Sequence, residues 1–485
     1  MTPNRLLLSA ACALFLFLAP ATAASSSGAV LDDALDTISV EEISADLHFL
    51  ASDEMKGRNT PSPEQRIAAR FIAARLQRLG WKPGAKDGYI FEYEMAMKAV
   101  DGAASKLSGK NGNGSVELEL GRDYAFSPSG LADYEISGEG AVFAGTGSKD
   151  DIEKLELDEH WAVCTSSDLS SRVVLGNLRK AGVVGVLVLP GPGLEAPAMK
   201  TRVEEWGTQA REGRLGRVSR RHRVPYLYVT QGGADKLLAL AGKEQPKLGD
   251  VLDLDLTEMR KVDDSIRVPL ENVAGYWPGT DPKLKHELLI VSAHYDHIGV
   301  STETGEVFNG ADDNGSGTTG LLAIAEGIAR YGPMRRSVML MWVSGEEKGL
   351  LGSAAWTKDP YLPDEVRPVA NINIDMIGRN ASDSLLITPT EEHDEHNGLV
   401  RLAESLSPLE GFPELGDCDA YWSRSDHANF ARNLDIPVTF LFSDVHEDYH
   451  KVTDTVDKID MDKIRRVARL VVRMLDGLQS DELAL

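Results

Sequence analysis

Cysteine and basic residues are both scarce in this sequence. Its 485 residues include 3 cysteines, and 75 acidic residues outnumber 51 basic ones, which gives a formal net charge of −24. Only Cys164 and Cys418 lie beyond the N-terminal leader, and two distant cysteines do not make a disulfide framework. Stability must therefore come from packing, for which the 42% hydrophobic content is sufficient. Such an acidic surface argues against nucleic acid and anionic membranes as partners.

Long hydrophobic runs are absent after the first residues of the chain. One apolar run, residues 6–20, follows Arg5 and leads into the small residues Ala21–Ala24. This arrangement is typical of a secretory signal peptide, and the run is too short to span a membrane comfortably. Cys12 lacks the leucine-led motif of a lipoprotein signal, so we favour ordinary secretory cleavage. We predict that residues 1–24 are a signal peptide and that the protein is periplasmic or secreted, with no stable membrane insertion after cleavage.

The expected secondary structure of the remaining sequence changes twice, near residues 121 and 259, which predicts an inserted domain. Residues 25–120 contain helix-like stretches at Glu41–Leu50 and Glu64–Leu79, where apolar residues recur every three or four positions. Residues 121–258 combine short β-like pieces with turns and hold no cluster of metal-binding residue types. Strand-like and helix-like segments alternate in residues 259–485. We therefore predict one main domain, built from residues 25–120 and 259–485, interrupted by a separate β-rich domain.

Two polar stretches, one before the insert and one within it, are predicted to be loops. Asp101–Gly114 is rich in glycine, serine and asparagine, which indicates a turn or loose loop. Leu194–Arg223 contains seven arginines after Met199. An arginine cluster could bind an anion, but this segment is more typical of a solvated loop. We expect the insert to carry no chemistry of its own.

The alternation in the last part of the chain predicts an α/β domain. Strands are expected at Glu287–Ser292, Ser337–Ser344 and Val369–Ile374, and a helix at Ser316–Gly332. Such an order favours a mixed, mostly parallel sheet flanked by helices. Ligands of these sheets bind beyond the carboxyl ends of the strands.

Residues that can bind metal stand at those strand ends. His294 and Asp375 end apolar strands, Glu347 follows a third, Asp312 precedes the helix, and His450 lies in a late loop. Imidazole and carboxylate without thiolate suit zinc, cobalt or manganese. Three carboxylates and two imidazoles exceed the needs of one tetrahedral ion, but they form two sets of three if one carboxylate bridges. We therefore predict two Zn²⁺ ions, with Co²⁺ or Mn²⁺ as alternatives.

Two more acidic residues suit the chemistry of such a site. Two ions about 3.5–4 Å apart can hold a hydroxide and polarise a carbonyl, and a base must then take the proton of the water. Glu346, next to a ligand, is the predicted base, and Asp296 is predicted to orient His294 through its other ring nitrogen. A lone acidic pair or a lone histidine is usually structural. The repetition of such groups at successive strand ends is what favours a site here.

Five motifs in this order resemble those of the co-catalytic di-zinc exopeptidases, typified by bacterial leucyl aminopeptidases, glutamate carboxypeptidase II and plasma carboxypeptidases. They are AHYDHIG from Ala293, NGADDNGSG from Asn309, SGEEKGLLGS from Ser344, NIDMIG from Asn373, and Tyr449-His450. LASDEMKGR from Leu50 and NVAGYWPGTDP from Asn272 are also similar to the family. The insert resembles a protease-associated domain at Val174–Leu189 and Val224–Tyr228.

This resemblance implies a role for each ligand candidate. Asp312 would bridge the two zinc ions, and the peptide bond after it, to Asp313, would be cis. One ion would be completed by His294 and Asp375, and the other by Glu347 and His450. Glu346 would be the general base, with Asp296 as the partner of His294. A binding or supporting role on the substrate side is implied for Ser425, Asp426 and His427. Support rather than ligation is expected of His297, His446 and Asp454.

The expected function is an exported zinc-dependent exopeptidase that acts on peptides. An aminopeptidase, which removes N-terminal residues by means of a metal-bridging hydroxide, is the favoured reading. A carboxypeptidase or dipeptidase with the same di-zinc site stays open, as do the preferred side chain and the oligomeric state. A silent binding protein, as in the transferrin-receptor branch of the family, fits less well because every ligand motif is intact.

Overall fold

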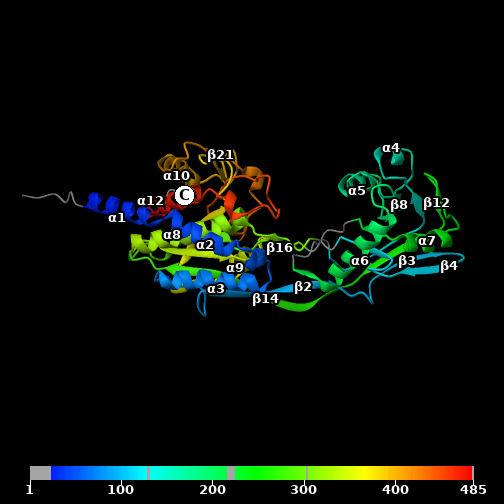
Figure 1. Cartoon of the computed structure of the whole chain (residues 1–485), viewed down its shortest axis with the longest axis horizontal. Helices are drawn as coiled ribbons and strands as arrows, with labels where there is room; N and C mark the ends of the chain where they lie inside the picture. The colour runs from blue at the N-terminus through cyan, green and yellow to red at the C-terminus, as the bar shows by residue number, and fades with distance from the viewer. Residues whose placement is uncertain (1–22, 128–130, 216–223, 302–303, 483–485) are drawn as a thin grey trace, which may run out of the picture. The chain divides into compact units, whose positions relative to one another are not determined.

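The chain folds into two compact units in the computed structural model, which describes residues 23–127, 131–215, 224–301 and 304–482 (Figure 1). Unit 1 comprises the chain up to Phe91 together with Glu271–Leu485, and unit 2 is Glu92–Leu270. The predicted signal peptide lies outside the described residues except for its last two positions. No helix within the described ranges is long and apolar enough to cross a membrane.

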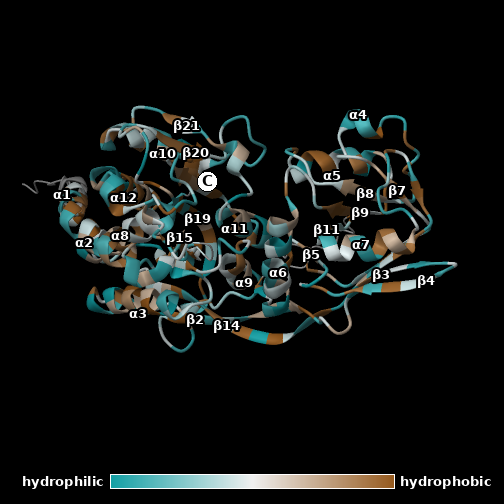
Figure 2. Cartoon of the chain, turned by 45° about the vertical axis from the view of Figure 1, so that its right-hand side comes forward, coloured by the Kyte–Doolittle hydropathy of each residue, from teal (hydrophilic) through white to brown (hydrophobic). Residues whose placement is uncertain are grey.

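Four parallel strands form the centre of the sheet in unit 1. They are β18 (Ser337–Val343), β15 (Glu287–His294), β19 (Arg367–Asp375) and β22 (Val438–Phe442), adjacent in that order. β15 and β18 are buried along almost their whole length, as expected of parallel strands covered on both faces. Figure 2 shows the hydrophobic residues gathered in central strands such as β19.

Antiparallel strands complete this sheet at both sides. β14 (Val262–Trp277) runs antiparallel to β18 and also pairs with the short β1 (Lys82–Pro83). On the other side, β20 (Leu385–Thr388) is antiparallel to β22 and parallel to β21 (Leu415–Asp417). The predicted mixed, mostly parallel sheet is confirmed.

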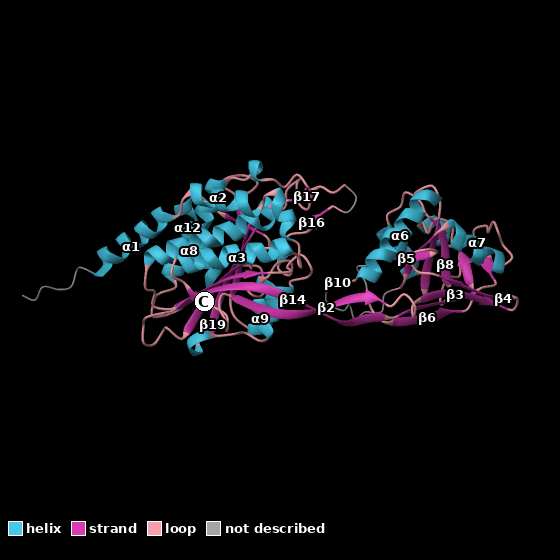
Figure 3. Ribbon diagram, turned by 60° about the horizontal axis from the view of Figure 1, so that its bottom comes forward, coloured by secondary structure: helices cyan, strands magenta, loops and turns pink. Residues whose placement is uncertain are grey.

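Helices cover both faces of the sheet (Figures 1 and 3). One face is covered by α2 (Val40–Leu50), α3 (Pro63–Arg78), α8 (Gly317–Tyr331), α10 (Gly398–Leu406) and α12 (Met461–Gly477), and α1 (Ala23–Thr37) lies against α8. The other face is covered by α9 (Leu351–Lys358) and α11 (His427–Leu434). Alternation along β15 explains the two cores: Val291 packs with the first set of helices and Ile290 with the second.

Local signals in α3 behave as the sequence suggests. The side chain of Ser62 caps the helix by accepting a hydrogen bond from the backbone N–H of Gln65 at 3.0 Å. The helix ends at Arg78 with Leu79 as its C-cap, and Gly80 follows in the left-handed region with φ +82°. Gly80 thus occupies the position after the C-cap, where a left-handed glycine commonly ends a helix.

Unit 2 contains a second parallel sheet of its own. Its parallel strands are β7 (Ala141–Phe143), β8 (Trp161–Thr165), β9 (Gly185–Leu189) and β11 (Tyr226–Val229), with β12 (Val251–Leu252) and β5 (Tyr124–Phe126) antiparallel at the edges. Its helices are α4 (Lys149–Ile152), α5 (Ser171–Lys180), α6 (Ala196–Glu212) and α7 (Gln231–Leu240). Cys164 here, and Cys418 in unit 1, are buried and free.

The unit is wider than the predicted insert of residues 121–258. The reason is a four-stranded sheet in which β3 (Lys106–Asn111) and β4 (Gly114–Leu118) form a hairpin, and β3 pairs with β13 (Asp255–Arg260), itself paired with β6 (Tyr134–Gly138). Much of the loop expected at Asp101–Gly114 is therefore strand. Pairing between distant segments is what the local composition did not reveal.

The expected loop at Leu194–Arg223 is also wrong for most of its length, because residues 196–212 form α6. Met199, Val203 and Ala210 are buried along one face of this helix, at helical spacing. The loop was predicted from the arginine content, although the apolar residues of the segment recur at helical spacing. The last arginines of the segment, within residues 216–223, lie outside the described residues.

Candidate metal centre

Three strands of the parallel sheet end side by side, and metal-binding groups follow each of them. β15 ends at His294 and its neighbour β19 at Asp375. On the other side of β15, β18 pairs Val343 with His294, so Glu346 and Glu347 follow at the same edge. This is the carboxyl edge of the sheet, where the site was expected.

His294 faces two carboxylates with one ring nitrogen and Asp296 with the other. Its Nε2 lies 3.2 Å from Oδ1 of Asp375 and 3.5 Å from Oδ1 of Asp313. Its Nδ1 lies 3.1 Å from the backbone carbonyl oxygen of Asp296 and 3.7 Å from a carboxylate oxygen of the same residue. A carbonyl oxygen only accepts, so Nδ1 carries the proton and donates to it. Nε2 is therefore the ring nitrogen that faces the two carboxylates, the orientation of a histidine that binds metal through Nε2.

A second group of ligands gathers on the other side of Asp313. Nε2 of His450 lies 3.1 Å from Oδ2 of Asp313 and 3.2 Å from Oε2 of Glu347. Nδ1 of His297 lies 2.9 Å from Oε1 of Glu347 and 3.8 Å from Oδ2 of Asp313. The two carboxylate oxygens of Asp313 thus face different histidines, His294 and His450. That is the arrangement of a carboxylate shared between two ions.

The carboxylate that lies between the two groups belongs to Asp313, whereas Asp312, the residue predicted there, is in neither group. Oδ1 of Asp312 accepts a hydrogen bond from the backbone N–H of Gly378 at 2.7 Å, and its Oδ2 lies 3.3 Å from Nε2 of His446. The predicted cis peptide is displaced in the same way, since it joins Asp313 to Asn314. The physical reason is local: the backbone leaves the helical conformation at Asp313, with φ −101° and ψ 96°, so the adjacent side chains point to different surroundings.

Hydrogen bonds from behind fix the loop that presents Asp313. The carboxylate of Asp454 accepts the backbone N–H of Asp312 at 3.1 Å and that of Asp313 at 3.2 Å. The side-chain oxygen of Asn314 accepts the backbone N–H of Met376, at the end of β19, at 3.0 Å. The loop is therefore tied to the strand that supplies Asp375.

The electrostatics of the group favour a positive charge at its centre. Burial and the neighbouring Glu347 raise the pKa of Asp313 to about 6. Burial lowers the pKa of His450, but Asp313 and Glu347 outweigh it and raise that pKa to about 10. Burial raises the pKa of Glu347, yet His297 and His450 together bring it below its ordinary range. The shift of Asp313 reflects repulsion between buried carboxylates, and the shifts of His450 and Glu347 reflect their attraction to positive charge.

The chemistry of the donors fits divalent metal ions. Nitrogen and oxygen are the only donor elements, and thiolate is absent from the two groups within the described residues. Nε2 of His450 is buried and, within the described residues, makes no hydrogen bond, although it points at carboxylates. A ring nitrogen in that position suits a metal ligand better than a packing residue. The set fits zinc, cobalt or manganese.

Glu346 lies beside the ligand candidates and lines the same cavity as Asp313 and Asp375. Its backbone N–H donates to Oδ1 of Asp296 at 3.2 Å, so Asp296 contacts both the base candidate and His294. Burial holds the pKa of the Glu346 carboxyl well above its ordinary value; His294 opposes this shift, and the charges of Glu347 and Asp375 reinforce it. A raised pKa is what a group needs if it is to hold a proton at neutral pH.

A cavity of about 50 Å³ opens onto this cluster. Its floor is acidic, made by Asp313, Glu346 and Asp375. Its walls are mainly apolar or aromatic and include Met376, Tyr421, Phe440, Phe442, Val445 and Tyr449. Ser425 and the exposed Arg424 also line it.

The sequence profile described as Peptidase family M28 matches residues 272–475, which contain every ligand candidate. This part of the chain belongs to peptidase family M28. A probable leucine aminopeptidase from Arthroderma benhamiae is 28% identical over 200 residues, which are 39% of this chain and 54% of that protein. The chain therefore spans about half the length of this curated relative.

Two solved structures share the fold of nearly the whole chain. An aminopeptidase from Aneurinibacillus sp. strain AM-1 superposes with a TM-score of 0.56 at 20% identity, covering 94% of this chain and 97% of that one. A zinc aminopeptidase from Bacillus subtilis gives a TM-score of 0.54 at 16% identity, covering 92% and 96%.

Of the three residues predicted on the substrate side of the M28 site, only Ser425 reaches the cavity. Its hydroxyl donates to Oδ2 of Asp375 at 2.8 Å. Asp426 is fully buried and accepts from the Ser353 hydroxyl, and the buried His427 ring stacks on Phe440 with centroids 4.7 Å apart. Burial lowers the pKa of His427 to about 3, so its ring stays neutral. Asp426 and His427 therefore lie behind the cavity lining, because the start of α11 turns both side chains inward, and of the predicted binding or supporting role this position favours support.

Sequence reasoning missed Arg58, which supports the M28 site from the N-terminal segment. This fully buried guanidinium donates to the carbonyl oxygens of Tyr295 at 3.0 Å, Asn309 at 2.8 Å and Gly310 at 3.0 Å, and also to that of Leu50. It joins the end of β15 to the loop that leads to Asp313. The motif LASDEMKGR, which ends at Arg58, was the available signal.

Proposed function

We propose that this protein is an exported zinc-dependent exopeptidase, and that it acts as an aminopeptidase. The observation that carries the proposal is Asp313, whose two oxygens face two separate sets of ligands beside Glu346. The family match and the aminopeptidases named above support the reaction class.

Each set of ligands would hold one ion. His294, Asp375 and one oxygen of Asp313 would hold the first, and Glu347, His450 and the other oxygen of Asp313 the second. Two zinc ions bound there would polarise the carbonyl of the scissile peptide and acidify the attacking water. The role assigned to Asp312 thus passes to its neighbour, and the other predicted ligands keep theirs.

Glu346 would move the proton. Its carboxylate accepts a proton from the attacking water, and the resulting carboxylic acid donates it to the nitrogen of the leaving amine. The raised pKa of Glu346 favours the protonated form that the second half of this transfer needs. Asp296 would fix the Glu346 backbone and the His294 ring relative to one another, because it accepts a hydrogen bond from each. General acid–base catalysis of this kind contributes about 10²–10⁴-fold to a rate.

The cavity favours recognition of an N-terminus. An ammonium group is attracted to the acidic floor of Asp313, Glu346 and Asp375, and the apolar walls suit a hydrophobic side chain. Arg424 is the specific observation in favour of the alternative, a dipeptidase or carboxypeptidase. Its exposed guanidinium lines the same cavity and could pair with a substrate carboxylate.

The remaining predictions also enter the proposal, with the insert of residues 121–258 widened to unit 2. The apolar leader supports export to the periplasm or beyond, and peptides are the proposed substrates. We also propose that unit 2 is an inserted domain of the protease-associated type. Its two passages to the M28 region lie within β2 (Ile90–Val100) and β14, where the chain leaves and re-enters unit 1.

The decisive experiment compares peptides blocked at one end. We expect leucyl peptides with a free N-terminus and an amidated C-terminus to be cleaved by the zinc-loaded protein, and their N-acetylated counterparts to resist. The opposite pattern would establish a carboxypeptidase, and cleavage of free dipeptides alone a dipeptidase. Tight binding of two zinc ions without hydrolysis of any peptide would instead support a binding protein.

A further inference from the structure

Unit 2 holds a cavity at a position where α/β sheets bind ligands. The cavity, about 320 Å³, is lined by residues at the carboxyl end of β8 and by residues following β7, together with the first residues of α5. Thr165 ends β8, Thr146 follows β7, and Ser170 is the N-cap of α5. Parallel strands direct their ligands to this edge, and the volume falls in the usual range for small-molecule sites.

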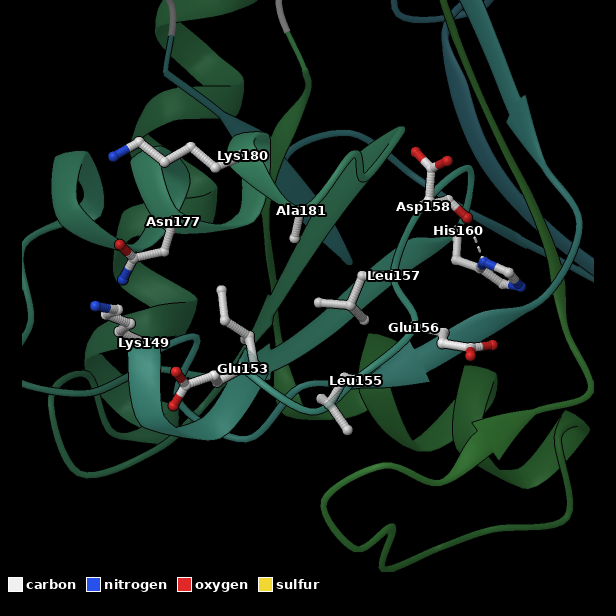
Figure 4. Close-up of a pocket in the computed structure, with 11 residues that line it drawn as sticks. Lys149, Glu153, Leu155, Glu156, Leu157, Asp158, His160, Asn177, Lys180 and Ala181 are labelled. Carbon is white, nitrogen blue, oxygen red and sulfur yellow. Dashed lines mark hydrogen bonds between the residues drawn. The ribbon is translucent and has the colours of Figure 1, made fainter.

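The lining of this cavity is positively charged, although the protein as a whole is strongly negative. Arg202 is its one charged lining residue within the described part of the chain, whereas the whole chain has a net charge of −24. A larger cavity of about 680 Å³ in the same unit differs, since Lys149 and Lys180 line it together with Glu153, Glu156 and Asp158 (Figure 4). Mixed charges select neither sign, but a lone guanidinium selects anions.

Arg202 is held in place without a carboxylate. Its guanidinium lies 5.6 Å from the ring centroid of Trp206 and 5.4 Å from that of Tyr228, so aromatic faces orient it. Within the described residues it forms no ion pair, whereas Lys200 on the same helix lies 3.8 Å from Glu204. The side chain is thus positioned, half-buried and still able to bind an oxyanion through two N–H groups.

Hydroxyl groups around Arg202 add donors. Ser167 and Ser170 each accept a backbone N–H, from Leu169 at 3.3 Å and from Val173 at 3.4 Å, which leaves their own protons to donate. Asp151 lies behind Thr146 and is engaged there, accepting the backbone N–H at 2.8 Å and the hydroxyl at 2.6 Å. The start of α5 contributes a further positive potential.

We propose that this cavity binds the anionic group of a small ligand, with Arg202 as its cation and Leu169, Val174 and Leu194 against the apolar part. The C-terminal carboxylate of a short peptide has this chemistry, and so does a phosphate. The site would give unit 2 a binding role, contrary to the expectation that the insert carries no chemistry. The inference does not depend on the proposed peptidase activity.

Binding to the full chain is measured by isothermal titration calorimetry in a Glu346→Gln background, which prevents turnover. The probes are N-acetyl-Ala-Leu, its C-terminal amide, and inorganic phosphate. Arg202→Gln removes the cation, and Arg179→Gln on α5, exposed and outside the cavity lining, is the matched control. Ser171→Glu is the second variant: an acidic residue in the first turn stabilises a helix, yet it places a repelling charge at the cavity.

We expect the peptide acid to bind at least about tenfold more tightly than its amide, because hydrogen bonds between charged groups are stronger than those between neutral groups. Arg202→Gln and Ser171→Glu should each lose that advantage, and Arg179→Gln should keep it. Arg202-dependent binding of phosphate without the peptide acid would support the anion site and assign it to phosphate. If neither probe binds, or if both bind the Arg202 and Arg179 variants alike, the proposal is overturned.

Discussion

Exchanging each of the two adjacent aspartates for asparagine separates the shared ligand from its neighbour. Asp313→Asn removes the negative charge from a buried carboxylate whose two oxygens lie 3.1–3.5 Å from Nε2 of His450 and of His294. Both proposed ions would lose a charged ligand at once. Asp312→Asn keeps an oxygen able to accept the Gly378 N–H, which is bonded at 2.7 Å in the native chain.

The magnitudes expected for the two variants differ widely. Loss of a residue that merely supports a ligand costs about 10–100-fold in metal affinity or activity, so loss of a shared ligand should exceed the upper end of that range. Asp312→Asn should stay within it and cost about 1–3 kcal/mol of stability, since Oδ2 faces His446 and a buried polar contact is altered.

The assay pairs zinc content by mass spectrometry with hydrolysis of a leucyl peptide amide, on protein checked for folding by circular dichroism. Asp313→Asn should retain fewer than two zinc ions per chain and be almost inactive. Asp312→Asn should retain both ions and measurable activity. The reverse result, zinc lost with Asp312→Asn and kept with Asp313→Asn, would refute the reassignment.

Three further predictions address the base, the N-terminal support and a buried acid. Glu346→Gln should lower kcat by about 10²–10⁴-fold while both zinc ions remain bound, and near-normal turnover would exclude it as the base. Arg58→Met leaves four carbonyl acceptors without their donor, so denaturant unfolding should show a loss of at least about 3 kcal/mol; an unchanged midpoint would contradict this role. Burial and the neighbouring Glu42 raise the pKa of Glu326 to about 8 despite the arginines Arg75 and Arg78 beside it. The native state therefore binds a proton that the unfolded chain releases near pH 4.5, so stability falls as pH rises towards 8, and Glu326→Gln should flatten that fall in unfolding curves recorded from pH 5 to 8.

Strand ends were the most predictable part of the site. His294 and Asp375 each close an apolar run, and the run itself identifies a buried parallel strand whose last residue lies at the ligand edge. The helix α8 was equally predictable, because helix-favouring apolar residues are concentrated in its middle, at Leu321–Ala325. These features depend on local sequence alone.

The choice between Asp312 and Asp313 could not come from local pattern. The two residues are chemically identical neighbours, and what distinguishes them is a backbone turn and the distant partners of their side chains, Gly378 for Asp312 and His450 for Asp313. The contact of His297 with Glu347 could not come from local pattern either. Its ring lies 2.9 Å from Glu347 only because the loop after β15 folds back to the end of β18.

Unit 2 shows the same limit at the scale of a domain. The start of the unit depends on β3 pairing with β13, which joins Lys106 to Met259 across the entire insert. The helix α6 was not predicted, because the many arginines of this segment indicated a solvated loop, although Met199 and Val203 are spaced for one buried helix face. One of those arginines, Arg202, lines the cavity proposed here to bind an anion.

Anomalous X-ray scattering at the zinc edge, from crystals of the purified protein, tests the central claim most directly. We predict two peaks of zinc density in the M28 region, one beside His294 and Asp375 and one beside Glu347 and His450, with a carboxylate oxygen of Asp313 bound to each. A single peak, or a pair of peaks bridged by Asp312, would contradict the account.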